Sequence, residues 1–212
     1  MGGTVTTVAV DHVIFVVDDL DDASTLLWQE HGLASIPGGH HAGHGTANRI
    51  VPLGDSYLEL MAVADEAEAA GSAMGRWALS RRTAALVPVG LCLRTDDADA
   101  EAARLGLTPM AMSRARPDGV VLSWRLVGAD EMFGRGLPFF IQWDDIALHP
   151  GRSAADHRQP VSGIEHVVMC GDLAALTWRI GRDMTTVAIA AGDPEVCRVT
   201  IGTGTRAIAL GR

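Results

Sequence analysis

The stretch that decides the fold runs from residue 8 to residue 32 and reads VAVDHVIFVVDDLDDASTLLWQEHG. Its first ten residues are mostly apolar and rich in β-branched side chains, which is typical of a buried strand. The acidic run at residues 18–22 then suits the start of a helix, and Gly32 suits its end. We therefore predict a strand over residues 8–17 that leads directly into a helix.

The same pattern occurs twice more in the chain. Its copies are Val89–Thr95 followed by Asp96, Asp97 and Gly106, and Ile164–Cys170 followed by Asp172 and Gly181. Short β-type runs follow each helix, so the sequence predicts a β-α-β-β-β unit that is repeated three times. The predicted fold class is α+β, with curved mixed sheets around a concave cup in which a ligand binds. The alternative is an ordinary α+β sandwich without internal repeats.

The composition restricts the function. The chain has 212 residues, 48% of them hydrophobic, which suits a buried core and argues against disorder. A net charge of -9 argues against nucleic acid or an anionic membrane as a partner, because the phosphates would repel the chain. All the basic residues are Arg, so chemistry that needs a Lys is excluded.

The cysteines and the N-terminus predict a cytoplasmic protein. Cys92, Cys170 and Cys197 are far apart, odd in number and set in apolar runs, so we expect reduced core thiols, with pairing of two of them as the alternative. Met1–Val10 lacks the charged start and long apolar stretch of a signal peptide. No apolar run approaches the ~20 residues that a membrane-spanning helix needs.

Several local motifs then carry a resemblance to a known family. The first unit contains DHVIFVV at residues 11–17, GGHHAGHGTANR at 38–49 and YLEL at 57–60. The second contains MSRARPDG at residues 112–119, WRL at 124–126 and PFFIQW at 138–143. Together these motifs resemble the glyoxalase-like domain family of the vicinal oxygen chelate superfamily.

The resemblance implies a domain organisation. Residues 8–145 form the glyoxalase-like domain, which consists of one unit at residues 8–63 and a second at residues 87–145. Residues 161–212 form a degenerate third unit that packs on this domain.

In that superfamily, two units supply metal ligands from their first and last strands. His12 and Glu59 match these positions in the first unit, and the resemblance implies that both are catalytic as well as metal-binding. The second unit offers Gly90 and Gln142 instead, which leaves His12, Glu59 and the weaker ligand Gln142 if units one and two pair.

Pairing of units one and three gives a different metal site. The third unit has His166 on its first strand but Ala209 opposite Glu59. His12, Glu59 and His166 then supply two histidines and one carboxylate, as in non-haem iron sites. The predicted cofactor is a divalent metal (Zn, Fe, Mn or Ni). The alternative is no metal, with a structural role for His12 and Glu59.

The resemblance also places other polar and aromatic side chains along the wall of the cup. As substrate-binding residues it suggests His41, Thr46, Asn48, Tyr57, Arg114, Arg116, Trp124 and Gln142. Alternation along a strand puts Arg114 and Arg116 on one face, where paired guanidinium groups suit a carboxylate or enolate. The alternatives are that the arginines balance acidic residues, Glu59 among them, and that Asn48 caps a local turn.

These features predict a protein that binds a small carbonyl, diol or carboxylate compound in the cup. Metal-assisted lyase, isomerase or dioxygenase chemistry fits this site, and a non-catalytic small-molecule binding or resistance protein is the alternative. Glyoxalase activity itself is not expected, because no other unit repeats the His and carboxylate pair. A homodimer is the expected assembly if the chain has a protein partner.

Overall fold

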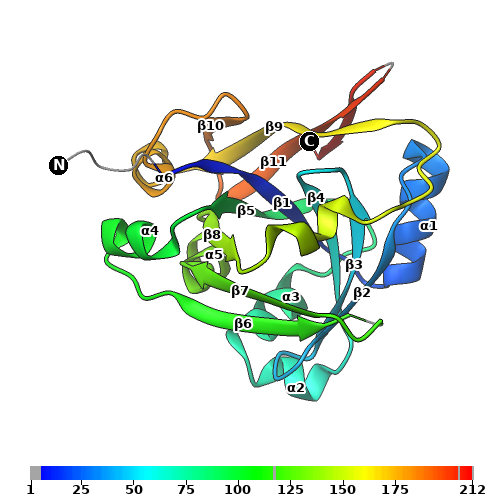
Figure 1. Cartoon of the computed structure of the whole chain (residues 1–212), viewed down its shortest axis with the longest axis horizontal. Coiled ribbons are helices and arrows are strands. Elements are labelled where there is room, and N and C mark those ends of the chain that lie inside the picture. The colour runs from blue at the N-terminus through cyan, green and yellow to red at the C-terminus, as the bar shows by residue number, and fades with distance from the viewer. Residues whose placement is uncertain (1–5, 117, 205, 212) are drawn as a thin grey trace.

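The computed structural model describes residues 6–116, 118–204 and 206–211 (Figure 1). The first unit consists of β1 (Val8–Val16), α1 (Leu20–His31), β2 (Ile36–His41), β3 (Thr46–Pro52) and β4 (Tyr57–Val63). Two short helices, α2 (Glu66–Ala70) and α3 (Ala73–Arg81), connect it to the second unit. The Ala- and Glu-rich connection is thus helical.

The second unit repeats this order and adds one helix. It consists of β5 (Pro88–Thr95), α4 (Ala98–Leu105), β6 (Met110–Ala115), β7 (Val121–Val127), α5 (Ala129–Arg135) and β8 (Phe139–Trp143). Two 3-10 turns follow, η1 (Ile146–Leu148) and η2 (Pro150–Arg152).

The third unit consists of β9 (Val161–Gly171), α6 (Leu173–Ile180), β10 (Val187–Ala191), β11 (Glu195–Thr203) and β12 (Ile208–Gly211). The predicted α+β class and its repeated β-α-β-β-β order are confirmed.

The helix starts and stops follow the acidic residues and glycines of the sequence. The Asp19 side chain accepts hydrogen bonds from the backbone N–H groups of Asp21 and Asp22, and Gly32 ends α1 with a left-handed φ of 68°. Asp97 and Asp172 cap α4 and α6 in the same way. No helix in the described ranges is long and apolar enough to cross a membrane.

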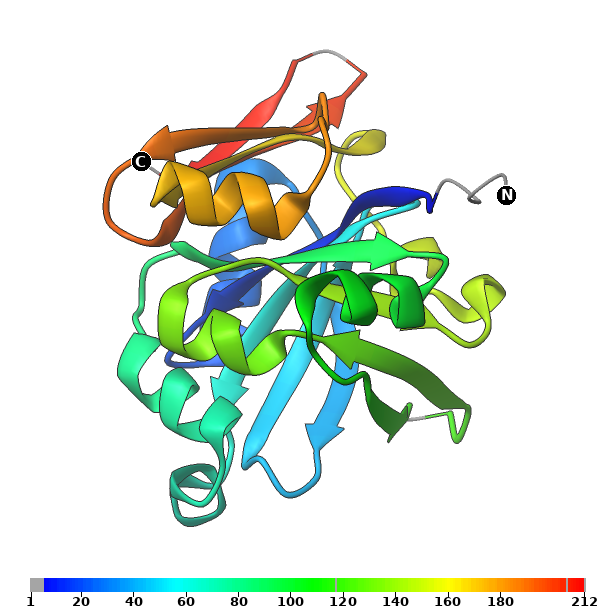
Figure 2. The same ribbon diagram turned by 90° about the vertical axis from the view of Figure 1, so that its left-hand side faces the viewer.

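The first two units share one eight-stranded sheet, in the order β2-β3-β4-β1-β5-β8-β7-β6. Antiparallel pairing of β1 with β5 joins the units at the centre. In the first unit β4 pairs in parallel with β1, and in the second unit β8 pairs in parallel with β5. Units one and two therefore pair to form the cup. The sheet curves until its edges approach each other, and a Cβ added at Gly39 of β2 would lie 3.1 Å from the Ala115 carbonyl of β6 (Figure 2).

The two faces of this sheet have separate apolar clusters. Val13 and Phe15 of β1 belong to the larger cluster, on the side of α1, α4 and the third unit. Ile14 and Val16 belong to a smaller cluster inside the curve, which α3 and α5 close through contacts that include Trp77. The strand alternation of β1 thus separates core residues from residues that face the cup.

The third unit forms its own four-stranded sheet, in the order β10-β9-β11-β12. This sheet lies over one side of the larger sheet, with β11 against β5 (Figures 1 and 2). Val167 and Val199 of the third unit join the same apolar cluster as Phe15 and Leu93. The two sheets therefore share one core.

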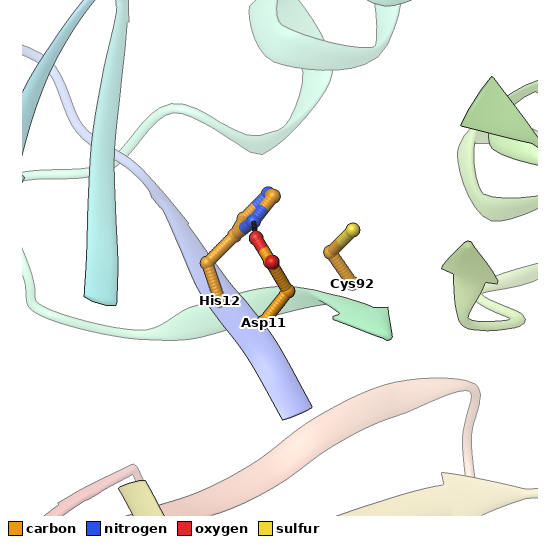
Figure 3. A group of neighbouring side chains, drawn as sticks. All are labelled: Asp11, His12 and Cys92. Carbon is orange, nitrogen blue, oxygen red and sulfur yellow. Dashed lines mark hydrogen bonds and ion pairs between the residues drawn. The ribbon is translucent and has the colours of Figure 1, made fainter. Parts of the chain in front are cut away.

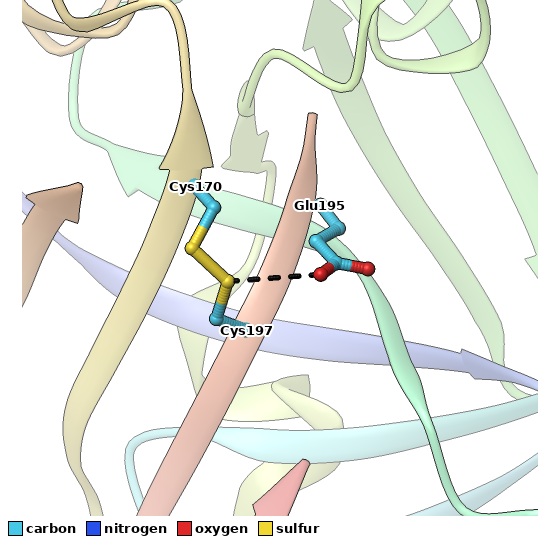
Figure 4. The surroundings of a disulfide bond; sticks show 3 residues. All are labelled: Cys170, Glu195 and Cys197. Carbon is cyan, nitrogen blue, oxygen red and sulfur yellow. Dashed lines mark hydrogen bonds between the residues drawn. A yellow bond between two sulfur atoms is a disulfide. The ribbon is translucent and has the colours of Figure 1, made fainter. Parts of the chain in front are cut away.

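Cys170 and Cys197 form a disulfide between β9 and β11 (Figure 4), which corrects the expectation of three reduced thiols. Their Cα atoms lie 6.0 Å apart, although the residues are 27 positions apart in the sequence. Met169 pairs with Val196, whereas Val168 pairs with Arg198, so Cys197 lies at an irregularity of the ladder beside Cys170. Cys92 is free and buried.

We expect the disulfide to stabilise the chain through its loop of 27 residues by about 3.5 kcal/mol. The Cys170→Ser and Cys197→Ser double variant should lose that amount in urea denaturation. Thiol titration of the unfolded, non-reduced chain should find one thiol, from Cys92, and three after reduction. Three thiols before reduction would show that the pair does not form.

Candidate functional site

The concave face of the eight-stranded sheet encloses a cavity of about 70 Å³. Its polar lining consists of His12, His41, Asn48, Tyr57, Glu59 and Arg114. The rest of the lining is apolar and includes four methionines and several aromatic rings, Trp124 among them. Most of the predicted site residues of the first unit therefore meet in one place.

A β-bulge in β1 organises the floor of this cavity. Val10 pairs with Leu93 and His12 pairs with Cys92, so Asp11 is an extra residue opposite β5. Adjacent residues of a regular strand point to opposite faces, whereas a bulge redirects a side chain. Here the Asp11 Oδ1 atom lies 2.7 Å from His12 Nδ1, and Cys92 lies beside the pair (Figure 3).

Asp11 is fully buried and is held as an anion by several N–H groups. Its Oδ2 atom lies 3.1 Å from His149 Nε2 and accepts a hydrogen bond from Trp143 Nε1 at 3.0 Å. Burial acts to raise the pKa of Asp11, but the hydrogen bonds from His12 and His149 outweigh it and hold that pKa well below its usual range.

The hydrogen bonds around Asp11 also determine which ring nitrogens carry protons. His149 Nδ1 accepts the backbone N–H of Gly151 at 3.2 Å, so its Nε2 carries the proton that Asp11 accepts. His12 donates from Nδ1 to Asp11, and its Nε2 atom lies 3.5 Å from Glu59 Oε2.

Glu59 is buried, with 6% of its surface exposed, between two histidines. Its Oε1 atom accepts a hydrogen bond of 2.5 Å from Asn48 Nδ2 and lies 3.7 Å from His41 Nε2. His41 Nδ1 lies 2.9 Å from the Thr46 hydroxyl, which donates towards Met74, so His41 donates from Nδ1 and turns its Nε2 lone pair to Glu59.

His41 is held in its neutral form. Burial lowers its pKa most strongly, and the nearby charges of Arg114, His44 and His40 lower it further, against the opposing effect of Glu59. His12 and the neutral His41 thus both turn their Nε2 atoms towards one carboxylate.

The two arginines of the second unit have different surroundings. Arg114 is 8% exposed, and its Nη1 atom donates to Asn48 Oδ1 at 3.2 Å. Asn48 therefore stands between Arg114 and Glu59, and within the described ranges no carboxylate forms an ion pair with Arg114. Arg116 instead forms an ion pair of 2.5 Å with Asp118.

The second unit offers an apolar wall opposite Glu59. Phe139, Ile141 and Trp143 of β8 line the cavity, so Gln142 between them points to the other face of the sheet. There its Oε1 atom accepts from the backbone of Ala98 at 2.9 Å, at the start of α4. The structure therefore does not bring Gln142 to the site.

His166 lies elsewhere. It is on β9 of the four-stranded sheet, opposite Thr200, and does not line the cavity. Because unit one pairs with unit two, the ligand set that depended on units one and three is not assembled.

Asp11, His12 and Cys92 form a second group that offers metal ligands, with one donor atom of each within 4.8 Å of the others. In this group the facing Asp11 and His12 atoms already share a hydrogen bond. Burial raises the pKa of the Cys92 thiol well above its usual value, and the Asp11 and Glu59 charges add to this. Among the described residues it is nevertheless the group whose donor atoms all lie within 4.8 Å of one another, which the donor atoms of His12, His41 and Glu59 do not.

Three of these roles were not predicted from the sequence. Asp11 had a signal, since it is a charged residue beside His12 within an apolar strand. Trp143 appeared only within the PFFIQW motif. His149 lies in a stretch rich in His, Pro, Gly, Arg and Ser, whose composition is typical of a loop, and its contact with Asp11 spans 138 residues.

Comparisons with known proteins place the chain among similar folds. The sequence profile of a glyoxalase-like domain matches residues 10–182. The crystal structure of a hypothetical protein from Staphylococcus aureus has 19% sequence identity and a TM-score of 0.67, over 96% of this chain and 84% of that one. No curated protein matches the chain.

Methylmalonyl-CoA epimerases match over a smaller part. The enzyme from Mycobacterium tuberculosis has 18% identity and a TM-score of 0.44, over 68% of this chain and 91% of that one. The Streptomyces coelicolor enzyme with bound 2-nitronate-propionyl-CoA has 18% identity and a TM-score of 0.47, over 65% and 95%.

Replacement of the buried carboxylate should destabilise the fold. We expect Asp11→Asn to lower the free energy of unfolding by about 3 kcal/mol, because its N–H partners lose a charged acceptor. Asp18→Asn, at an exposed position of the same segment, is the control and should change it by less than about 0.5 kcal/mol.

This difference in stability should depend on pH. It is fully present above the ordinary pKa of Asp, about 4, and shrinks as the pH falls below it. The reason is that the unfolded chain then binds a proton that folded Asp11 does not. Urea denaturation between pH 3 and pH 7 measures it, and a constant difference would contradict the buried anion.

Proposed function

The chain belongs to the glyoxalase-like domain family, and we propose that it binds a small carbonyl, diol or carboxylate compound in its cavity and moves a proton beside the bound carbonyl. The observation that carries the proposal is the buried Glu59 carboxylate, with His12 Nε2 at 3.5 Å and His41 Nε2 at 3.7 Å. A carboxylate between two ring nitrogens is arranged to exchange a proton with either ring or to share a cation with them.

Glu59 is the proposed base. Asn48 occupies its Oε1 atom, and Oε2 faces both the cavity and His12. A proton that Glu59 takes from a carbon atom can pass to His12 Nε2, because the Asp11 anion stabilises the imidazolium that forms. Arg114 at the wall suits the oxygen on which negative charge develops.

The residue types around Glu59 suit a divalent metal ion, although their donor atoms do not all lie within 4.8 Å of one another as those of Asp11, His12 and Cys92 do. His12, His41 and Glu59 would hold it, and Asp11 and Thr46 fix the two rings through Nδ1, as partners of metal-binding histidines commonly do. Two imidazoles and one carboxylate suit Zn, Fe, Mn or Ni, with coordination positions left for a ligand. Such an ion would act as a Lewis acid on a carbonyl or diol oxygen.

The remaining wall suits an uncharged reacting group. Tyr57 stacks on the His12 ring with centroids 4.5 Å apart, and burial, followed by the Asp11 and Glu59 charges, raises its pKa well above the usual value. The phenol therefore stays neutral. With Trp124 and the methionines it surrounds the reacting group with apolar surface.

Non-catalytic binding is a second candidate function. It is favoured by the apolar wall of the second unit, where Cys92, Phe139 and Ile141 supply no partner for the His12 and Glu59 pair. In this case the cavity would retain a small molecule without changing it.

The assembly and compartment stay predictions. A homodimer is a proposal from the family resemblance. The cytoplasmic location is a proposal that the disulfide opposes, because disulfides persist mainly in oxidising compartments.

We expect the metal to depend on Glu59 rather than on Cys92. Calorimetric titration with Ni²⁺ or Zn²⁺ should show one site per chain, weakened at least about tenfold in Glu59→Gln because a ligand is lost. Cys92→Ala is the matched control and should bind as the wild type does. Weaker binding in Cys92→Ala together with unchanged binding in Glu59→Gln would instead assign the ion to the group of Asp11, His12 and Cys92.

Proton transfer should be visible as isotope exchange. In D₂O, wild-type protein should exchange the C3 protons of 2-oxobutyrate, followed by proton NMR, and Glu59→Gln should slow this by about 100-fold or more. His166→Asn, outside the cavity, should leave the rate unchanged. Binding without exchange, in both metal-free and metal-loaded protein, would favour the non-catalytic alternative.

A further inference from the structure

A second, larger hollow adjoins the cavity. It has a volume of about 550 Å³ and shares His41, Met112 and Arg114 with the inner cavity. It is formed by the tip of the β2–β3 hairpin and by β6, the two edges that approach each other where the sheet nearly closes. A molecule in the inner cavity can therefore extend into this hollow.

The lining of this hollow is basic. We call it the basic mouth and define it by His40, His41, His44, Arg114 and Arg116. Among the described residues that line it there is no Asp or Glu, although the whole chain has a net charge of -9. A basic concavity on an acidic protein concentrates anions locally.

Two buried polar groups of the basic mouth lack a partner among the described residues: Arg114 has no acidic partner, and His44 Nδ1 has no hydrogen-bond partner. Arg114 is 8% exposed and donates one hydrogen bond, to Asn48, without an acidic partner in the ranges that the structure describes. Burial of such a guanidinium group costs several kcal/mol unless an anion offsets it. His44 Nδ1 is buried without a hydrogen-bond partner among the described atoms.

The sizes of the inner cavity and the basic mouth indicate a ligand with two parts, one in each space. The inner cavity, at about 70 Å³, is small beside typical ligand sites of roughly 300–1,000 Å³, whereas the mouth lies within that range. Arg114, at the junction of the two spaces, can hold an oxygen of the group inside, and the histidines outside favour a second, anionic group.

We propose that the basic mouth binds a second anionic group of the substrate, which makes the substrate a small carbonyl or carboxylate compound that also carries a phosphate or another carboxylate. This inference rests on the proposed function, because the reacting end must lie in the inner cavity. Arg114, at the junction, holds the oxygen of the reacting end, and His40 and His44 hold the second anion.

Three probes test this by calorimetry at one fixed pH. Propionate carries one anion, and succinate and 2-carboxyethylphosphonate extend it with a second carboxylate or a phosphonate. We expect at least one of the dianions to bind about tenfold more tightly than propionate. The tighter of the two identifies the second anion as carboxylate or phosphate.

Variants locate the effect. His44→Gln, and separately the exposed His40→Gln, should lower the ratio of dianion affinity to propionate affinity from about tenfold to about threefold or less. Propionate binding itself should be unchanged. Arg76→Gln removes a charge from an exposed position of α3, outside the mouth, and should retain the tenfold advantage. The His40 variant keeps the test valid if the His44 variant does not fold.

The outcomes separate the two proposals. Equal affinity for propionate and both dianions would overturn the basic mouth and leave the proposed function standing. An equal loss in Arg76→Gln and in the histidine variants would attribute the advantage to overall charge and would also overturn it. Failure of all three probes to bind would overturn the proposed function and, with it, this inference.

Discussion

The buried Asp11 carboxylate is the interaction on which the rest of the site depends. A carboxylate with no exposed surface is stable only when nearly all its acceptor positions are occupied. Its N–H partners come from three distant places: His12 on the bulged strand β1, Trp143 at the end of β8, and His149 between the two 3-10 turns. The one anion thus ties both units and their connector together, and it fixes the ring of His12 that faces Glu59.

This arrangement also explains why the two units are no longer equivalent. β8 directs Phe139 and Ile141 into the cup, and Trp143 from the same face supports Asp11 rather than offering a ligand. The second unit therefore contributes apolar surface, the Trp143 donor and Arg114, while His12, His41 and Glu59 all come from the first. The candidate base and both histidines thus lie on one side although the architecture is repeated.

The sequence predicted what depends on neighbouring residues and missed what depends on distant ones. Strands, acidic helix starts and glycine stops are local signals, and the repeated fold followed from them. Side-chain alternation could not place Gln142, because a shift of one residue reverses the face of a strand. The disulfide depends on an irregularity in the pairing of β9 with β11, and His149 depends on the path of an irregular connector. Neither contact leaves a periodic pattern in the sequence.

No described residue of the third unit lines the cavity, yet the third unit packs against α5, which does. Arg179 of α6 is fully buried and pairs with Glu131 of α5, while Ala129, Met132 and Phe133 of α5 line the cavity. Arg104 of α4 donates to the carbonyl of Arg179 at 2.7 Å, which joins a second helix to the same contact. A buried guanidinium group is costly without a carboxylate, so the ion pair with Glu131 favours the packing of α5 against α6. The third unit thus packs on one wall of a site to whose lining it contributes no side chain among the described residues.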